Sequence, residues 1–214
     1  MRVVGLACLA VFISVPAFAA PAVDNERVTV WDIPLAKGTS APATPSDFDS
    51  VTMFLEGGSV STKHADGSVT TATRQFGDAV FNKKGSPSVD TAASDGVREI
   101  VIALKDPKRS VIDPSPAGIP ISFPRPGADK MLEGDGFIVW RFNWIPKTPV
   151  AMHHHDKDTV MVFRYNGTLC STPLTGEARD IPFKQGQISY AKAGGTHTET
   201  LMTEHQAAVD LELK

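Results

Sequence analysis

The sequence lacks several features that other protein classes require. Among its 214 residues there are two cysteines, and aromatic residues make up 7% of the chain. Cys8 lies in the apolar segment at the N-terminus, so Cys170 has no internal disulfide partner and is expected to be a buried, unreactive thiol. No later stretch reaches the roughly 18 apolar residues of a transmembrane helix. No segment shows the 3.6-residue apolar periodicity of an amphipathic helix.

An excess of basic residues is also missing. The chain has 21 Lys and Arg against 24 Asp and Glu, which gives a formal net charge of −3. Proteins that bind nucleic acid need a basic face. Neither nucleic acid nor an anionic membrane surface is therefore expected as a partner.

The N-terminus has the pattern of a secretory signal peptide. Arg2 precedes a short apolar run over residues 3–13, and Ala17 and Ala19 form an Ala-x-Ala cleavage site. Residues 1–19 are therefore predicted to be removed, leaving about 195 residues. The mature chain is expected in the periplasm or outside the cell, with no membrane attachment.

The sequence contains an internal repeat. Residues 31–105 align without a gap with residues 140–214, and 14 of the 75 aligned positions are identical. Trp31 pairs with Trp140, and Asp49 pairs with Asp158. Four glycines also pair, namely Gly58, Gly67, Gly77 and Gly85 with Gly167, Gly176, Gly186 and Gly194. Because turns use glycine at positive φ, the pairs predict four turns kept in register.

Each copy predicts short strands rather than helices, since apolar and β-branched residues alternate between Gly and Pro turns. The expected fold class is all-β, with two similar β-barrels or sandwiches related by the repeat. The predicted domains are residues 20–105 and 134–214. Residues 106–133 are rich in proline and are predicted to form an extended connector packed over one barrel.

Histidines in the second copy are the main candidates for chemistry. His153, His154 and His155 are adjacent, and His197 follows 42 residues later. On a strand, alternate side chains share a face, so His153 and His155 point together while His154 points away, to the surface or behind a ligand. The alternative is that the three adjacent histidines lie in a solvent-exposed polar turn and bind nothing. Trp144 is a further candidate for lining a pocket, because its counterpart in the first copy is Leu35.

The second copy resembles the cupin superfamily. The first cupin motif is Gly, five residues, His-x-His, three or four residues, Glu, six residues, Gly; the second is Gly, five residues, Pro-x-Gly, two residues, His, three residues, Asn. His153, His155, Gly167, Gly186 and His197 fit this spacing. The sequence departs from the motifs at Lys147, Val160, Lys192 and Leu201, which take the first Gly, Glu, Pro and Asn positions.

This resemblance implies two tandem cupin-like jelly-roll barrels. It implies that His153, His155 and His197 are metal ligands, with Asp158 as a possible fourth ligand in place of the missing Glu. Glu199, two residues after His197, is expected to point inward and is the candidate proton carrier. The equivalent ligand positions in the first copy are Thr44, Ser46 and Ser88, so that barrel is expected to bind no metal.

Three functions remain open from the sequence. The first is a metal-dependent enzyme, such as a dioxygenase or decarboxylase, that acts on a small organic molecule with iron, manganese, copper, nickel or zinc. The second is a barrel that binds a metal or small ligand without turnover, and the third is a purely structural two-barrel protein. A monomer or a homodimer is expected.

Overall fold

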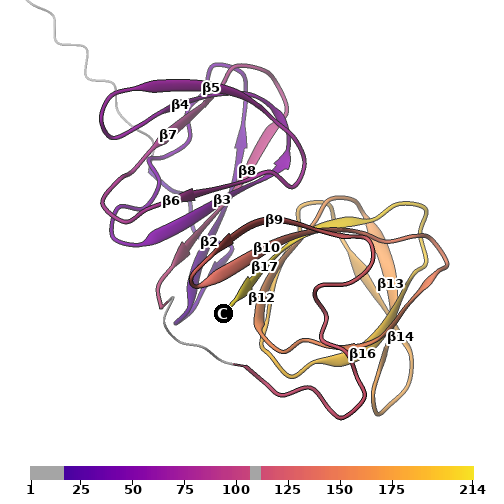
Figure 1. Cartoon of the computed structure of the whole chain (residues 1–214). Coiled ribbons are helices and arrows are strands. Elements are labelled where there is room, and N and C mark those ends of the chain that lie inside the picture. The colour runs from indigo at the N-terminus through magenta and orange to yellow at the C-terminus, as the bar shows by residue number, and fades with distance from the viewer. Residues whose placement is uncertain (1–16, 107–111) are drawn as a thin grey trace, which may run out of the picture.

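The structure, a computed structural model, describes residues 17–106 and 112–214, and within them every regular element is a β-strand. The predicted signal peptide falls mostly on residues 1–16, which lie outside the described residues. None of the described segments is a helix long and apolar enough to cross a membrane. Figure 1 shows two rounded bodies, one from each copy of the repeat, that meet along one side. The predicted all-β fold is confirmed.

Each body is built from two facing sheets. The larger sheet of the first barrel has the order β1-β2-β8-β3-β6, and the smaller one has the order β5-β4-β7. The strands are β1 (Val23–Asp24), β2 (Val28–Leu35), β3 (Asp49–Glu56), β4 (Gly58–Lys63), β5 (Val69–Arg74), β6 (Ala79–Asn82), β7 (Val89–Ala92) and β8 (Val97–Leu104).

The second barrel repeats this plan strand by strand. Its larger sheet has the order β9-β10-β17-β12-β15 and its smaller sheet the order β11-β16-β13-β14. The strands are β9 (Ala128–Gly134), β10 (Phe137–Asn143), β11 (Pro149–His154), β12 (Asp158–Phe163), β13 (Gly167–Pro173), β14 (Arg179–Phe183), β15 (Ile188–Ala191), β16 (Thr196–Leu201) and β17 (Ala207–Leu213). The edge strand β11 corresponds to a single bridge in the first barrel, between Ser40 and Thr91.

The two larger sheets pack face to face, and their contact is the largest apolar core of the protein. Residues from both barrels belong to it, including Ile100 and Ile102 of β8 and Val209 and Leu211 of β17. The opposite faces of these strands look into their own barrels, where Val101 and Ala208 join separate cores. Strands β8 and β17 are therefore buried on both faces, and the shared core joins the two barrels into one unit.

The glycine pairs hold three turns in register and not four. Gly67 and Gly176, Gly77 and Gly186, and Gly85 and Gly194 all have positive φ. Gly58 and Gly167 instead begin strands β4 and β13, where an added Cβ would lie 2.5 Å from Ser94 Oγ or 2.8 Å from Thr203 Oγ1. For this fourth pair, close packing rather than backbone conformation requires glycine.

The chain that precedes β9 packs over the second barrel. The last residues of the predicted connector, 128–133, form most of β9 in the larger sheet. Before β9, the chain runs beside the edge strand β11, where the Ser122 amide donates to the His154 carbonyl and the His154 amide donates to the Pro120 carbonyl. The connector therefore covers the edge of the barrel that carries the histidines.

Candidate metal centre

The smaller sheet of the second barrel brings the three predicted ligands together. His153, on β11, is the direct cross-strand partner of His197 on β16. His155 follows the end of β11, and its amide donates to the Gly195 carbonyl at 2.8 Å. His153 and His155 share a face by strand alternation, and pairing with β16 adds His197 to that face.

The three imidazoles form a compact cluster. Ring centroids lie 4.7 Å apart for His153 and His197, and 5.1 Å apart for each of the other two pairs. One nitrogen from each ring lies within 4.8 Å of the others. His153 Nδ1 is 2.8 Å from the Ala151 carbonyl oxygen. Since a carbonyl only accepts hydrogen bonds, Nδ1 carries the proton, and the lone pair is on Nε2.

Burial keeps two of these rings neutral. Loss of hydration lowers the pKa of His153 to about 4. Burial, followed by repulsion from His197 and His153, lowers the pKa of His155 to about 3. A metal binds neutral imidazole, so both rings are ready to act as ligands at neutral pH without first losing a proton.

Glu199 lies beside the cluster, as the sequence predicted. It is buried, and its Oε2 is 3.7 Å from His197 Nε2. Burial opposes ionisation, but the neighbouring His197 ring and the charge of Arg125 lower the pKa of Glu199 to about 2. The side chain is therefore a carboxylate in the interior of the barrel.

Arg125, from the connector, completes the cluster and was not predicted. Its Nη1 donates to His153 Nε2 at 3.2 Å, and its Nη2 lies 3.0 Å from Glu199 Oε1. The guanidinium lies 3.8 Å from the ring centroid of Phe142 and 4.8 Å from that of Phe123. A single arginine between prolines carries no sequence signal for such a position, because the contact depends on how the connector folds back over β11.

A second unpredicted feature is Asp210 on β17. It is completely buried, and neither carboxylate oxygen has a hydrogen-bond partner among the described residues. Burial raises the pKa of Asp210 to about 8, against the attraction of Arg125 and with added repulsion from Glu199. The alternation of apolar and acidic residues in β17 resembles that of a half-exposed strand, but its acidic face is turned into the barrel.

Asp158 does not join the cluster, which corrects the expectation of a fourth ligand. Its Oδ2 accepts from Arg27 at 3.1 Å and from the Tyr190 hydroxyl at 2.7 Å, and its Oδ1 accepts from the Ala193 amide. Its repeat counterpart, Asp49, accepts from the Lys84 amide, which is the position equivalent to Ala193. The aspartate therefore accepts from the equivalent backbone amide in both barrels, and in the second it also binds Arg27 and Tyr190.

The structure also revises the residue at the motif's Glu position. Val160 faces the core between the barrels and not the histidines. Thr159, one residue earlier, lines the cavity that contains His155 and His197. The shorter motif spacing, with three residues after His155, is therefore the one that points into the barrel, and it still supplies no carboxylate.

Lys147, at the position of the motif's first glycine, has a φ of 57°, the only positive φ among the non-glycine residues that the structure describes. Its counterpart in the first copy is Gly38, with a φ of 79°. The backbone at this position thus retains the conformation for which the motif uses glycine.

Three further expectations are settled by side-chain positions. His154 points away from the cluster but is 2% exposed, because Nδ1 bonds Thr196 and Nε2 bonds the Asp113 carbonyl in the connector. Trp144 packs in the barrel core with Phe142 and Phe163, and it lines neither cavity beside the histidines. Cys170 is half-buried rather than buried, and desolvation and Asp180 raise its thiol pKa.

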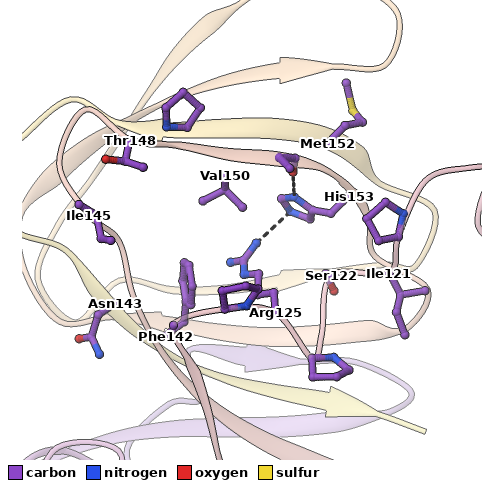
Figure 2. Close-up of a pocket in the computed structure, with 16 residues that line it drawn as sticks. Ile121, Ser122, Arg125, Phe142, Asn143, Ile145, Thr148, Val150, Met152 and His153 are labelled. Carbon is purple, nitrogen blue, oxygen red and sulfur yellow. Dashed lines mark hydrogen bonds between the residues drawn. The ribbon is translucent and has the colours of Figure 1, made fainter.

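Two cavities reach the cluster from different sides. A barrel-side cavity of about 280 Å³ is lined by His155, His197 and Glu199. A connector-side cavity of about 410 Å³ lies between the connector and β11 and is lined by His153 and Arg125. In Figure 2, the Arg125 guanidinium reaches across the connector-side cavity to His153.

The first barrel has hydrogen bonds where the second has its histidines. Thr44 and Ser88 are buried, the Ser88 amide donates to Thr44 Oγ1, and Ser88 Oγ donates to Asn82 Oδ1. Ser46, the third counterpart, is partly buried. Thr44 Oγ1 thus bonds a backbone amide and Ser88 Oγ bonds the Asn82 side chain, whereas each histidine places one nitrogen within 4.8 Å of the others.

The residues fit a divalent metal ion. A tetrahedral zinc ion, with bonds of about 2.1 Å, places its ligand nitrogens about 3.4 Å apart. Side chains whose nitrogens already lie within 4.8 Å reach that spacing by small rotations. The three-histidine cluster is thus consistent with a divalent metal site in the second barrel.

No protein-family model and no curated protein sequence matches the chain. Solved structures do match it. AerE from Microcystis aeruginosa has a TM-score of 0.63 and 12% identity over 87% of each chain. Oxalate decarboxylase from Bacillus subtilis, described as having Mn(II) centres, has a TM-score of 0.62 and 11% identity over 87% of this chain and 69% of its own. A cupin 2 conserved barrel domain protein from Leptotrichia buccalis has a TM-score of 0.55 and 12% identity over 90% and 86%. At these identities the likeness shows the fold alone: the chain has the cupin fold, in two barrels.

Proposed function

We propose that the second barrel binds a divalent metal ion through His153, His155 and His197, and that the chain is an exported metal-dependent enzyme acting on a small organic molecule. The observation that carries this proposal is the convergence of three imidazoles beside a buried carboxylate. Iron, manganese, copper, nickel and zinc all accept such ligands. Dioxygenase and decarboxylase reactions are the leading classes.

The bound ion would supply Lewis-acid or redox chemistry and retain open coordination positions, because only three protein ligands face it. The protein side chains would divide the remaining work. Glu199 is ionised at the border of the barrel-side cavity, and it would accept a proton once a bound ligand or metal draws away Arg125 and His197, which now hold its pKa at about 2. Phe163, Leu169 and Phe183 line the same cavity and restrict water.

The main alternative is a barrel that binds a metal or small ligand without turnover. An inward carboxylate beside the ion counts against this alternative, since a binding site has no need of a proton acceptor. The third possibility, a structural two-barrel protein, is disfavoured by the contrast between the barrels. The first shows that the scaffold tolerates Thr44 and Ser88 at these positions, so folding does not require histidines there.

The proposal is tested by metal analysis of purified protein by inductively coupled plasma mass spectrometry. The wild type is expected to retain close to one equivalent of metal, and the His153→Ala/His155→Ala variant almost none. The matched control is His64→Ala/His205→Ala, which removes one half-buried and one exposed histidine outside the cluster and should leave the metal content unchanged. Equal metal content in the wild type and the His153/His155 variant would end this proposal.

Turnover is tested separately with Glu199→Gln. An enzyme would retain its metal in this variant but lose most of its oxygen uptake or carbon dioxide release with a panel of organic acids. Metal binding by the wild type without turnover in either assay would favour the binding alternative.

We further propose a periplasmic or secreted setting, from the signal-peptide pattern of residues 1–19. We also propose a monomer or homodimer, because two barrels already pair within one chain.

A further inference from the structure

The connector-side cavity has apolar walls. It lies between residues 120–127 and strand β11, with Phe142 and Asn143 of β10 on one wall (Figure 2). Ile121, Phe142, Ile145 and Val150 line it, together with four prolines of the connector and β11. Its volume of about 410 Å³ suits a small organic molecule, and its walls favour an apolar body.

The inner end of the cavity is charged. Arg125 is nine-tenths buried there, between Phe142 and Phe123, and bonds His153 and Glu199. Its Nε is buried and has no hydrogen-bond partner among the described residues. A guanidinium has five N–H donors in a planar fork that matches a carboxylate, and two neutral or singly charged partners do not use them all.

The local charge favours an anion. Arg125 pairs with one carboxylate, Glu199, at 3.0 Å, and its Nη1 donates to His153 Nε2 at 3.2 Å. Asp210 is held protonated near neutral pH and adds no negative charge. A divalent ion in the cluster would leave two positive charges in a buried place, where charge compensation is worth most. The ion would also take the His153 lone pair that Arg125 now uses, which frees the Nη1 donor.

We infer that the connector-side cavity binds an organic monocarboxylate with an apolar body, its carboxylate on Arg125 and its body against Ile121, Phe142 and Val150. The position beside the metal rests on the proposed function. The contact between Arg125 and the carboxylate can be measured without metal, although there the ligand shares Arg125 with His153 and Glu199 and is expected to bind more weakly than in the metal-loaded protein. The connector, which the repeat does not include, would then determine the substrate class.

The test is isothermal titration calorimetry of the full chain with 3-phenylpropionate, in metal-free and zinc-loaded forms. Arg125→Gln is expected to weaken 3-phenylpropionate binding at least tenfold, with Arg125→Lys intermediate because it keeps the charge but loses the fork. The neutral probe 3-phenylpropan-1-ol should bind the wild type and Arg125→Gln equally. Acetate, which lacks the apolar body, should bind the wild type at least tenfold more weakly than 3-phenylpropionate.

Two filling variants locate the probe. Val150→Trp obstructs the connector-side cavity and is expected to abolish 3-phenylpropionate binding, whereas Met161→Trp narrows the barrel-side cavity and should leave it. Circular dichroism and thermal melts verify that each variant is folded. Equal binding by the wild type and Arg125→Gln overturns the inference, as does loss with Met161→Trp but not with Val150→Trp. If the wild type takes up no metal, the proposed function fails, while the metal-free titration still decides this inference.

Discussion

Arg27 Nη1 donates to Asp158 Oδ2 at 3.1 Å, and this buried ion pair joins the first barrel to the second. Asp158 also accepts from the Tyr190 hydroxyl and the Ala193 amide. Burial opposes its ionisation, but these hydrogen bonds and Arg27 lower its pKa below the ordinary value. The carboxylate that the sequence offered to the metal is thus used to hold the barrels together.

We predict that Asp158→Asn destabilises the protein by about 3 kcal/mol, because it removes the carboxylate paired with the buried Arg27, which also donates to Lys214 O. Its metal content should equal that of the wild type. Chemical denaturation and metal analysis measure the two effects. The control is Asp49→Asn in the first barrel, where the aspartate only accepts from the exposed Lys84 amide and the cost should be about 1 kcal/mol. Loss of metal in folded Asp158→Asn would contradict the structural role.

Asp210 predicts a specific pH dependence. Its folded-state pKa is raised from 3.8 to about 8, so its contribution to stability is fully present below pH 3.8 and is lost as the pH rises to 8. Asp210→Asn removes this dependence. Both proteins are compared metal-free. The free energy of unfolding of the variant minus that of the wild type should be larger at pH 8 than at pH 5 by more than about 2 kcal/mol. Urea denaturation at these pH values measures it, and a difference that does not vary with pH would show that Asp210 is not buried as a neutral acid.

Gly186 of the second barrel packs against Arg98 of the first barrel, with no room for a side chain. Its φ is 73°, and an added Cβ would lie 2.0 Å from Arg98 Nη2, whose guanidinium is bonded twice to Asp32. Gly186→Ala should therefore cost about 2–3 kcal/mol, from a left-handed backbone and a displaced ion pair. The control is Gly67→Ala, with a φ of 84° and no atom within 4 Å of the added Cβ, which should cost only about 1 kcal/mol. Thermal melts that rank the two variants in the opposite order would refute the contact.

Lys147 predicts a stabilising substitution. Its φ of 57° is unfavourable for a residue with a Cβ, and Gly38 adopts a φ of 79° at the equivalent position of the first barrel. Lys147 is exposed, so little packing is lost on replacement. Lys147→Gly should raise the free energy of unfolding by about 0.5–1 kcal/mol. Lys147→Ala keeps the strain and should not stabilise; equal gains in both variants would assign the effect to the side chain rather than to the backbone.

The sequence predicted the scaffold because the repeat records local requirements. Turns that need positive φ retain glycine in both copies, and strands that face a core retain apolar residues at the same register. The candidate ligands were predictable for a similar reason, since strand alternation places His153 and His155 on one face whatever lies around them.

Partners that depend on packing were not predictable. Asp158 was open to two roles until Arg27, 131 residues earlier, was brought against it. Asp210 and Glu212 alternate with apolar residues as on a half-exposed strand, and only the packing of the two larger sheets turned them inward. Arg125 belongs to no sequence motif or periodic pattern from which its contacts could be predicted.

By itself, then, the sequence determined two repeated β-barrels and the face that carries three histidines, because these follow from backbone periodicity and turn chemistry. The tertiary structure decided which charged groups surround that face. Arg125, Glu199 and Asp210 come from the connector, β16 and β17, and their ionisation depends on burial and on one another rather than on their positions along the chain.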